Sequence, residues 1–598
     1  MKSVHVKVAL ALLAFLFTLP AAAPALARPA TAVQPQAQST ASTSINLAHL
    51  DALSQQVTIG GQQMLIIHVY SEYPDYKWVD ASGEGIACVD DAARAVVVYL
   101  NDYKQTHNEQ SLNKARELLT FVMHMEANDG EFYNFIQKDL TINTDGATSK
   151  KSFDWWAMRA MWALGSGYNV FKHEDPAFAE KLQSSFLLAN TALQQKIDSK
   201  YGSYILLHGY KIPAWIDGFD AMSNALLGLT EFYQARPLNV VKDSMLKVGR
   251  GLAEYQYGSN TQFPFGAHLD WNGSVSLWHA YGSGQSFALA RAGMLLHQNG
   301  WIASAKQEAD QLFTHLLVTG MINQMAPTPD KNGQIAYGVD MLTQGFMAVY
   351  QATHDPRYAR DAGIAASWFT CNNDAHFAMY DPAHGYGYDG LDGTTGKVSL
   401  NSGAESTIEA LMALQVVNQN PVALSMANVK TIERHTASIY EAEASKITAG
   451  NPQIITPTSS WTGEALYSGQ IVKMSNNDQL QQDLQVTHAG KYMLSAALVK
   501  PHTLTGVLAL EIGIDGHHVS TIRVQRSPDI DYLTLVGAEH PFSLSTGKHT
   551  LTVTLKGEAN ASLVVDNFVL QPLKEFAVFQ MPNGSHFTLM HDLTGDRD

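Results

Sequence analysis

The chain has 598 residues, a length that predicts two or more domains because a single hydrophobic core does not grow to that size. It carries 39 Lys and Arg against 55 Asp and Glu, a formal net charge of -16, without a basic run that could follow a phosphate backbone. Nucleic acid is therefore excluded as an expected partner. Two cysteines, Cys88 and Cys371, exclude a disulfide framework and leave a single bridge open, because sequence does not place their Cβ atoms.

The first 27 residues have the parts of a cleavable secretory signal. Lys2 and Lys7 give a basic start, residues 8–19 are apolar, and small residues end at Ala27, where we expect cleavage. Residues 28–44 are rich in Ala, Pro, Gln, Ser and Thr, which predicts a flexible leader. No later stretch of the sequence is apolar for long enough to span a bilayer. We therefore expect a secreted or periplasmic protein without membrane insertion.

Residues 45–420 are expected to form paired helices. Apolar residues recur there at helical spacing, and short turns such as Arg236-Pro237 alternate with connections of roughly fifteen to thirty residues, longer than usual loops. The expected helices span residues 88–105, 110–126, 153–171, 176–197, 219–234, 240–257, 284–298, 302–319, 339–353, 356–369 and 403–417, with 45–55 as a candidate for a twelfth.

Helical hairpins with long loops at one end only predict an all-α (α/α)6 toroid. In that fold every inner helix starts at the long-loop end, so that all these loops share one mouth. A superhelical solenoid of hairpins is the main alternative. The sequence shows neither the fixed period nor the repeated signature that a solenoid requires, which favours the toroid.

The pattern changes to short alternating runs after a linker expected at residues 421–436. Runs such as 479–486 and 562–570, separated by turn pairs such as Asp515-Gly516, predict an all-β sandwich over residues 437–573. The expected fold class is therefore multidomain, a helical toroid followed by a β-sandwich. The last residues, 574–598, are treated as a C-terminal tail because no pattern in them predicts an element.

Carboxylates stand at five of the six expected inner-helix starts. An Asp or Glu there often only satisfies free N–H groups and complements the helix dipole. Carboxylates from different helices beside aromatic rings, however, are what cleavage of a glycosidic bond needs, one as the acid and one as nucleophile or base. We expect Asp91 and Glu405 to be the catalytic pair, with Asp90, Asp154 and Asp217 as further candidates. A pair taken from two different helices is favoured over Asp90 with Asp91, because adjacent helical residues point about 100° apart.

Other residues near these starts are candidates for substrate binding. Arg94 is expected either to hold a substrate carboxylate or to form an ion pair with a neighbouring Asp. The remaining candidates are Asp340 and the aromatic residues Trp156, Trp215, Trp271, Trp278 and Tyr388, for which packing between hairpins is the alternative. The histidines are not spaced as a metal set, so we expect no catalytic cofactor.

Two segments resemble motifs of the six-hairpin glycosidase superfamily. They are residues 85–95, with Asp90-Asp91 followed by Arg94, and residues 401–407, Asn-Ser-Gly-Ala-Glu-Ser-Thr. Related domains carry an Asp-Asp-x-x-Arg segment on an early inner helix and a Gly-Ala-Glu-Ser-Thr segment on a late one. The resemblance covers about residues 60–420 and implies a toroidal glycosidase domain.

The C-terminal region resembles the calcium-stabilised β-sandwich carbohydrate-binding modules. The residues that carry this resemblance are 439–444, 478–492 and 565–568. It implies a structural calcium held by Glu441, Glu443 and Asp566, and oxygen-only ligands from both ends of a domain suit that ion.

The sequence therefore predicts a secreted glycoside hydrolase that acts on a polysaccharide or oligosaccharide. One alternative is a polysaccharide lyase on the same toroid, using His268, His279, Tyr281 or Arg94 as the base or as the group that neutralises a uronate. An acid-rich cleft would repel a uronate polymer, which disfavours this alternative. The other alternative is a non-catalytic glycan-binding protein.

Overall fold

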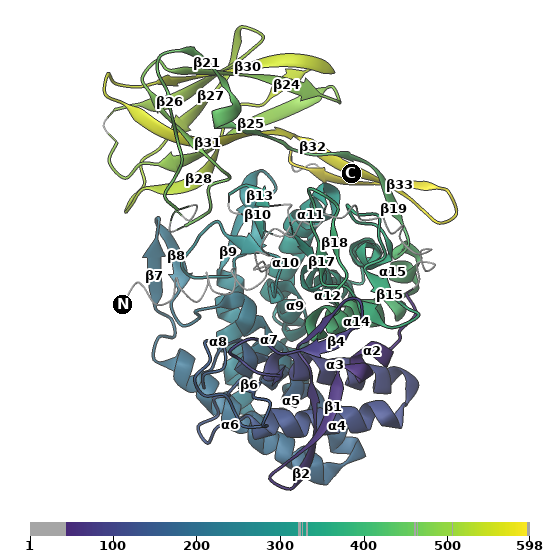
Figure 1. Cartoon of the computed structure of the whole chain (residues 1–598). Coiled ribbons are helices and arrows are strands. Elements are labelled where there is room, and N and C mark those ends of the chain that lie inside the picture. The colour runs from purple at the N-terminus through teal and green to yellow at the C-terminus, as the bar shows by residue number, and fades with distance from the viewer. Residues whose placement is uncertain are drawn as a thin grey trace, which may run out of the picture. The chain divides into compact units, whose positions relative to one another are not determined.

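The computed structural model describes residues 43–594 except 321–323, 326, 331–332, 460–461, 463 and 505 (Figure 1). The expected signal and all but the last two residues of the expected leader lie outside the described residues. In the part of the chain that is described, no helix has the length and apolarity needed to cross a membrane.

Within the described residues, six helices form a closed inner ring in which each packs against the next and the last packs against the first. In order these are α3 (Val89–Thr106), α5 (Trp155–Glu174), α7 (Phe219–Ala235), α9 (Gln285–Leu296), α12 (Ala336–Thr353) and α14 (Ala404–Asn418). Each is followed by an outer partner: α4 (Glu109–His124), α6 (Pro176–Asp198), α8 (Asn239–Glu254), α10 (Asn299–Glu308), α13 (Pro356–Ala366) and α15 (Pro421–Met426). The (α/α)6 toroid is thus confirmed.

Four of the six outer helices in the described residues begin with a capping side chain. Asn108, Asp175, Asp355 and Asn420 each accept a hydrogen bond from an N–H of the first turn. Proline stands at the start of α6, α13 and α15, where its fixed φ suits a first helical turn. Among the described inner helices, α5, α7, α9, α12 and α14 begin without a side-chain cap. The acids at inner-helix starts are therefore mostly not caps.

The twelfth helix lies at the other end of the domain from the one we expected. Residues 45–55 contain only the short α2 (Ala48–Ala52), followed by a hairpin of β1 (Ser54–Ile59) and β2 (Gln62–Ile67). The twelfth helix is instead α15, inside the segment expected to be a linker, because Asn420 caps it and Pro421 starts it. The expected helix 302–319 is present as α10, a π-helical turn η1 (Ala309–Phe313) and α11 (Thr314–Thr319).

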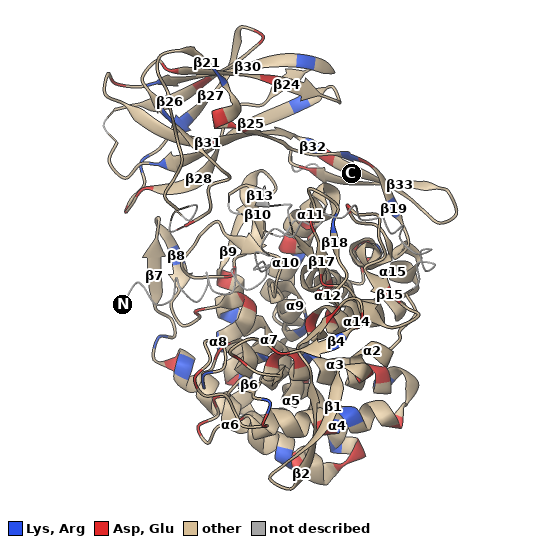
Figure 2. Cartoon of the chain, in the orientation of Figure 1, with Lys and Arg blue, Asp and Glu red and all other residues tan. Residues whose placement is uncertain are grey.

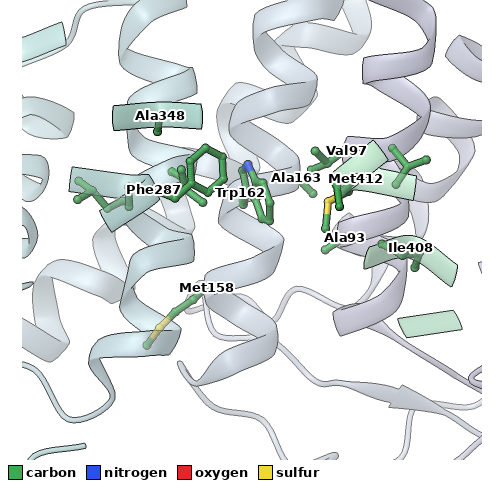
Figure 3. Packing of buried hydrophobic residues seen from close by; sticks show 14 of the residues in the cluster. Ala93, Val97, Met158, Trp162, Ala163, Phe287, Ala348, Ile408 and Met412 are labelled. Atoms are coloured by element: carbon green, nitrogen blue, oxygen red, sulfur yellow. The ribbon is translucent and has the colours of Figure 1, made fainter. Parts of the chain in front are cut away.

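The centre of the toroid is filled by apolar side chains from the inner helices. Figure 3 shows Val97, Trp162, Phe287 and Met412, from four of these helices, meeting near the axis. The long connections at the helix starts fold into short antiparallel sheets. Their strands are β3 (Tyr70–Glu72), β4 (Lys77–Val79), β5 (Ala87–Cys88), β6 (Phe135–Ile136), β7 (Tyr204–Leu207), β8 (Tyr210–Pro213), β9 (Gln256–Ser259), β10 (Gln262–His268), β11 (Trp278–His279), β12 (Gln324–Met325), β13 (Pro329–Asp330), β14 (Gln334–Ile335), β15 (Tyr380–Asp381), β16 (Tyr386–Gly387), β17 (Gly390–Leu391) and β18 (Val398–Ser399).

The C-terminal region is an all-β sandwich of two antiparallel sheets, as expected. One sheet has the order β22 (Gln453–Ile455), β23 (Ile471–Ser475), β31 (Ser562–Pro572), β25 (Gly490–Lys500) and β28 (Tyr532–Gly537), with β20 (Ser438–Glu441) paired to β31 and β29 (Phe542–Leu544) to β25. The other is β21 (Lys446–Ala449), β24 (Gln479–Val486), β30 (Gly547–Lys556), β26 (Leu508–Ile514) and β27 (His517–Val524). Alternate residues such as Leu551, Val553 and Leu555 fill the core between them.

The expected linker and the expected tail pair with each other. Strands β19 (Lys430–His435), β32 (Lys574–Gln580) and β33 (His586–Asp592) form a three-stranded sheet. The alternation in β32 is hidden in the sequence because Glu575 takes an inward position, where Nδ1 of His315 and Nδ1 of His591 contact its carboxylate at 2.7 and 3.1 Å. Cys88 and Cys371 are free, so the bridge that sequence left open does not form.

Candidate active site

Arg94, in the second turn of α3, lies among three carboxylates at the starts of the inner helices. Its Nη2 contacts Asp91 Oδ1 at 2.8 Å and Glu405 Oε2 at 3.1 Å, and its Nη1 contacts Glu409 Oε1 at 2.5 Å. Asp91 lies one turn before Arg94, and Glu405 and Glu409 lie one turn apart on α14, so both helices present these groups on one face. We call these four residues the Arg94 cluster.

A further buried carboxyl group lies behind Arg94, beside Glu409. Asp340 on α12 is fully buried. Burial, followed by the nearby charge of Glu409, raises the pKa of Asp340 well above its ordinary value. Gln344 Nε2 donates to Asp340 Oδ1 at 3.0 Å. Asp340, which we expected to bind substrate, therefore lies behind the site.

Asp91 and Glu405 have different environments although both contact the same nitrogen of Arg94. Because of that shared contact, their nearest oxygens are within about 6 Å of each other. Asp91 is buried and accepts a hydrogen bond from the Cys88 thiol at 3.2 Å, and burial outweighs Arg94 to raise its pKa to about 6. The Glu405 side chain is 47% exposed. The expected pair is thus brought together as one buried acid and one solvent-facing carboxylate.

Asp90 forms an ion pair with a second arginine, Arg159 of α5. We did not predict a role for Arg159 from the sequence. Arg159 Nη1 contacts Asp90 Oδ1 at 2.9 Å, and its Nη2 donates to the Tyr337 hydroxyl at 2.5 Å. Trp155 covers its guanidinium at 4.8 Å from the ring. Trp155 and Arg159 are four residues apart on one helix, a spacing that could have been read from the sequence.

His279 forms a second cluster with two buried acids, Asp220 of α7 and Asp270. His279 Nε2 lies 3.3 Å from Asp220 Oδ2, and its backbone N–H donates to Asp270 Oδ2 at 2.9 Å. Burial would lower the pKa of His279, but the charge of Asp270 outweighs it and raises the pKa to about 9. The imidazole stacks on Tyr281 at 4.3 Å between ring centres. We call these four residues the His279 cluster.

The His279 cluster adjoins the side chains around Arg159 at Gly282. A Cβ atom on this glycine would overlap the Trp155 ring and would lie 2.9 Å from the Tyr337 hydroxyl. The loop that carries His279 therefore packs against the side chains around Arg159. Five inner helices, α3, α5, α7, α12 and α14, contribute to this mouth.

Tyrosines line the mouth beside Glu405. Tyr70 is 44% exposed, and burial of its hydroxyl end, then the charges of Asp91 and Glu405, raise its pKa. Tyr76 and Tyr386 stack at 4.0 Å. The expected substrate-binding residue Tyr388 lies in the same group, where it forms a hydrogen bond with Tyr76. Tyr70 is exposed and the other three are half-buried, and aromatic faces of this kind suit the apolar faces of sugar rings.

Three of the expected tryptophans are not in the mouth. Trp156 is buried and donates its indole N–H to Phe132 O at 2.7 Å, so its neighbour Trp155 is the one that faces Arg159. Trp215 is buried and donates to Lys247 O on α8 at 3.1 Å. Trp278 is fully buried as well. For these three, packing between hairpins, the alternative that sequence left open, is what the structure shows.

Trp271 and two expected acids lie elsewhere. Trp271 packs with Leu277 against Ala465 and Tyr467 of the β-sandwich. Asp217 is paired with Lys196 of the outer helix α6 at 3.4 Å, because it precedes the helix start whereas Asp220 lies inside the first turn. Asp154 occupies the N-cap position of α5, is exposed and makes no cap bond.

The three expected calcium ligands converge in the sandwich around Ser468. The Ser468 hydroxyl donates to Glu441 Oε2 at 2.7 Å and to Asp566 Oδ2 at 3.2 Å, and Gln470 N donates to Glu443 Oε1 at 3.2 Å. Glu443 Oε2 is buried without a hydrogen-bond partner among the described residues. Burial, then the charges of Glu441 and Glu443, raise the pKa of Asp566 to about 7. An orphaned oxygen and crowded carboxylates fit a hard cation.

Two groups among the described residues have both the composition and the spacing of a metal site, and Glu441, Glu443 and Asp566 are not one of them. In His315, Glu575 and His591, and again in Asp220, Asp270 and His279, one ligand atom from each residue lies within 4.8 Å of the others. In both groups the histidines are within ion-pair distance of the carboxylates. Charge pairing therefore accounts for both arrangements.

No protein-family model matches the chain, and no curated protein is similar to it. Solved structures match parts of it. A sugar epimerase from a ruminal bacterium matches 59% of this chain and 92% of its own, with 14% identity and a TM-score of 0.41. Cellobiose 2-epimerase from Bacillus thermoamylovorans covers the same shares with 13% identity and a TM-score of 0.42. A family 35 carbohydrate-binding module from Clostridium thermocellum matches 23% of this chain and 98% of its own, with 16% identity and a TM-score of 0.19. At these scores no activity follows from the matches.

Proposed function

We propose that this protein is a secreted glycoside hydrolase that cleaves glycosidic bonds in a polysaccharide or oligosaccharide. The observation that carries the proposal is the arrangement of Asp91 and Glu405 on Arg94. General acid catalysis needs a carboxyl group that still holds its proton near the working pH, and burial gives Asp91 that property. The second step needs a carboxylate open to substrate and water, which the exposure of Glu405 provides.

In this mechanism Asp91 donates its proton to the leaving oxygen while the bond from that oxygen to the anomeric carbon breaks. Glu405 either attacks the anomeric carbon or takes a proton from the water that attacks it. Arg94 then stabilises the new carboxylate of Asp91 at 2.8 Å. Tyr70 and the Tyr76–Tyr386 stack supply faces for the neighbouring sugar rings.

The test is hydrolysis of a panel of polysaccharides, read by reducing ends and product chromatography. Asp91→Asn and Glu405→Gln are expected to lose about 10²- to 10⁴-fold in rate with folding retained. Asp217→Asn is the matched control, because Asp217 stands near an inner-helix start but pairs with Lys196 on the outer layer. Full activity in both site variants would overturn the proposal. Retention on a polysaccharide without any product would favour the non-catalytic alternative.

A lyase is the second candidate, and the observation that favours it is the stack of His279 on Tyr281 beside the mouth. A cationic His279 could neutralise a uronate while Tyr281 acts as base. Asp220 and Asp270 already balance that charge, and His268 is buried against Glu308 at 2.7 Å, away from the mouth. Absorbance from an unsaturated product in the same panel would select the lyase.

For the sandwich, we propose that Glu441, Glu443 and Asp566 hold a structural calcium. Bound calcium would neutralise three crowded carboxylates and join the first and last strands of the sheet, β20 and β31. A role of this domain in holding the enzyme near its polymer belongs to the same proposal.

A further inference from the structure

A cavity of about 320 Å³ opens at the end of the toroid opposite the mouth. All six inner helices contribute to its lining, mainly with residues from their C-terminal halves. Lys104 and Gln105 come from the last turn of α3, whereas Asp91 and Arg94 come from its first two turns. The volume lies at the lower end of the range for small-molecule sites. We call this cavity the axial pit.

The base of the axial pit is apolar and its rim is polar. Trp162 and Phe287 lie at the base, with their rings at 75° to each other and ring centres 6.2 Å apart (Figure 3), and Met412 also lines the pit. Five side-chain amides line the walls and rim: Asn101, Gln105, Gln344, Gln351 and Gln419. An aromatic floor with amides around it suits a ring that has apolar C–H faces and hydroxyls at its edge.

Most of these amides are free to bind a ligand. Among the described residues, the side chains of Asn101, Gln105, Gln351 and Gln419 make no hydrogen bond with the protein. Glu231, the acid of the pit, is already engaged, because Arg291 Nη2 contacts it at 2.5 Å and Asn169 Nδ2 donates to it at 2.8 Å. An amide offers both donors and an acceptor, as a hydroxyl does, so the unused amides match a polyol.

We propose that the axial pit is a second sugar-binding site that takes one monosaccharide unit. We infer the class of ligand from the side chains that line the pit, so the inference does not depend on hydrolysis at the mouth. Gln344 lines the pit and donates to Asp340, so a layer of side chains through Asp340 and Glu409 separates the bound sugar from Arg94. Each site therefore binds its own ligand independently of the other.

The test measures binding of glucose, galactose, mannose and glucuronate to the full chain by saturation-transfer NMR. Gln351→Met and Gln419→Met remove exposed amides of the rim with little change in size, and each is expected to weaken binding by about threefold to tenfold. The double variant should lose at least about tenfold by the same reasoning. Gln110→Met on the outer helix α4 is the matched control and should bind as the parent does.

Two further measurements keep this site distinct from the mouth. Glu405→Gln should leave pit binding unchanged, whether or not the enzyme hydrolyses glycosides. Catalytic rates on any substrate found should be unaffected by Gln351→Met. The proposal is overturned when no sugar of the panel binds, when the double variant binds as tightly as the parent, or when Glu405→Gln alone abolishes binding.

Discussion

The guanidinium of Arg94 is the group around which the mouth is organised. One buried cation meets three carboxylates, and the pKa of the neighbouring Asp340 is raised by burial and by the charge of Glu409. Removal of a buried charge from such a network leaves its partners uncompensated. Arginine suits this position better than lysine, because its planar fork donates to Asp91, Glu405 and Glu409 at once.

The first prediction concerns the pH dependence of Asp91. Its pKa of about 6 means that the protonated acid is depleted as the pH rises above about 6. The rate of hydrolysis should therefore fall about tenfold per pH unit on the alkaline side. A pH–rate profile of kcat/KM measures this, on any polysaccharide that the panel identifies.

The control for this prediction is a substrate whose leaving group needs no protonation. An aryl glycoside with an acidic phenol leaves without protonation, so its alkaline limb should shift or vanish. An unchanged alkaline limb in Asp91→Asn would contradict the assignment of Asp91 as the acid.

At the scale of the elements, the toroid depends on close contact between inner helices. Gly165 of α5 and Gly228 of α7 face each other, and a Cβ on Gly165 would overlap the Gly228 carbonyl oxygen. The two backbones approach closely only because neither residue has a side chain.

The second prediction is that Gly165→Ala destabilises the protein by about 1–3 kcal/mol, since the inner helices must move apart. Thermal unfolding measures the change. Gly300→Ala in α10 is the matched control, because a Cβ there meets no atom within 4 Å, and it should be neutral or slightly stabilising. Equal thermal unfolding midpoints for the two variants would contradict the close approach of the α5 and α7 backbones.

The third prediction belongs to the sandwich. A pKa of Asp566 raised from 3.8 to about 7 favours the protonated form, so this stabilisation is present below pH 3.8 and is lost as the pH rises through about 7. Without calcium the loss is on the order of 4 kcal/mol. Calcium takes the place of the proton, so the rise in melting temperature on adding calcium should be large at pH 8 and small at pH 5. Calorimetry with calcium or with a chelator measures it.

Variants that each remove a single carboxylate distinguish calcium binding at Asp566 from general screening of negative charge by calcium. Asp566→Asn should raise the stability of the calcium-free sandwich at pH 8 and abolish the response to calcium. Asp483→Asn, at an exposed position of β24, should keep the full response. An equal calcium response at pH 5 and pH 8 would argue against Asp566 as a ligand.

At the scale of the whole described chain, the sandwich packs against the toroid through a buried carboxylate. Glu464 Oε1 accepts hydrogen bonds from Ser274 Oγ at 2.9 Å, Val275 N at 2.7 Å and Ser276 Oγ at 2.8 Å. These residues lie in the loop between Asp270 and His279. The sandwich therefore helps to position the loop of the His279 cluster.

The fourth prediction is that Glu464→Ala uncouples the two domains. Three donors of the loop lose their acceptor, at a cost of about 3 kcal/mol or more, and unfolding should separate into two transitions. Calorimetry and proteolysis of the 271–279 loop measure the change. Glu511→Ala, exposed on β26, is the control and should keep the parent's profile.

The same contact should depend on pH through His208. Burial would lower the pKa of His208, but its hydrogen bonds to Glu464 and Asp529 outweigh burial and raise it. This stabilisation is present below the ordinary value of 6.5 and is lost as the pH rises through the folded pKa. The domains should therefore separate more easily at alkaline pH, and an interface that strengthens with pH would contradict this assignment.

The sequence by itself determined eleven of the twelve toroid helices and the change to a β-sandwich, because helical and strand periodicities are local properties of the chain. It also predicted Asp91 and Glu405 as a pair, since an Asp-Asp-x-x-Arg segment and a Gly-Ala-Glu segment mark two helix starts, and the structure brings both side chains to Arg94. It did not separate Trp155 from Trp156 or Asp220 from Asp217, because residues one to three positions apart share a local pattern and differ only in the neighbour they face. Arg94 meets Glu405 and Glu409 only because α14 packs against α3 and closes the ring of inner helices. The two glutamates are more than three hundred residues away from Arg94 in the sequence. Tertiary packing likewise decided the inward position of Glu575 in β32, because one of its partners, His315, comes from a distant helix and the other, His591, from the neighbouring strand β33.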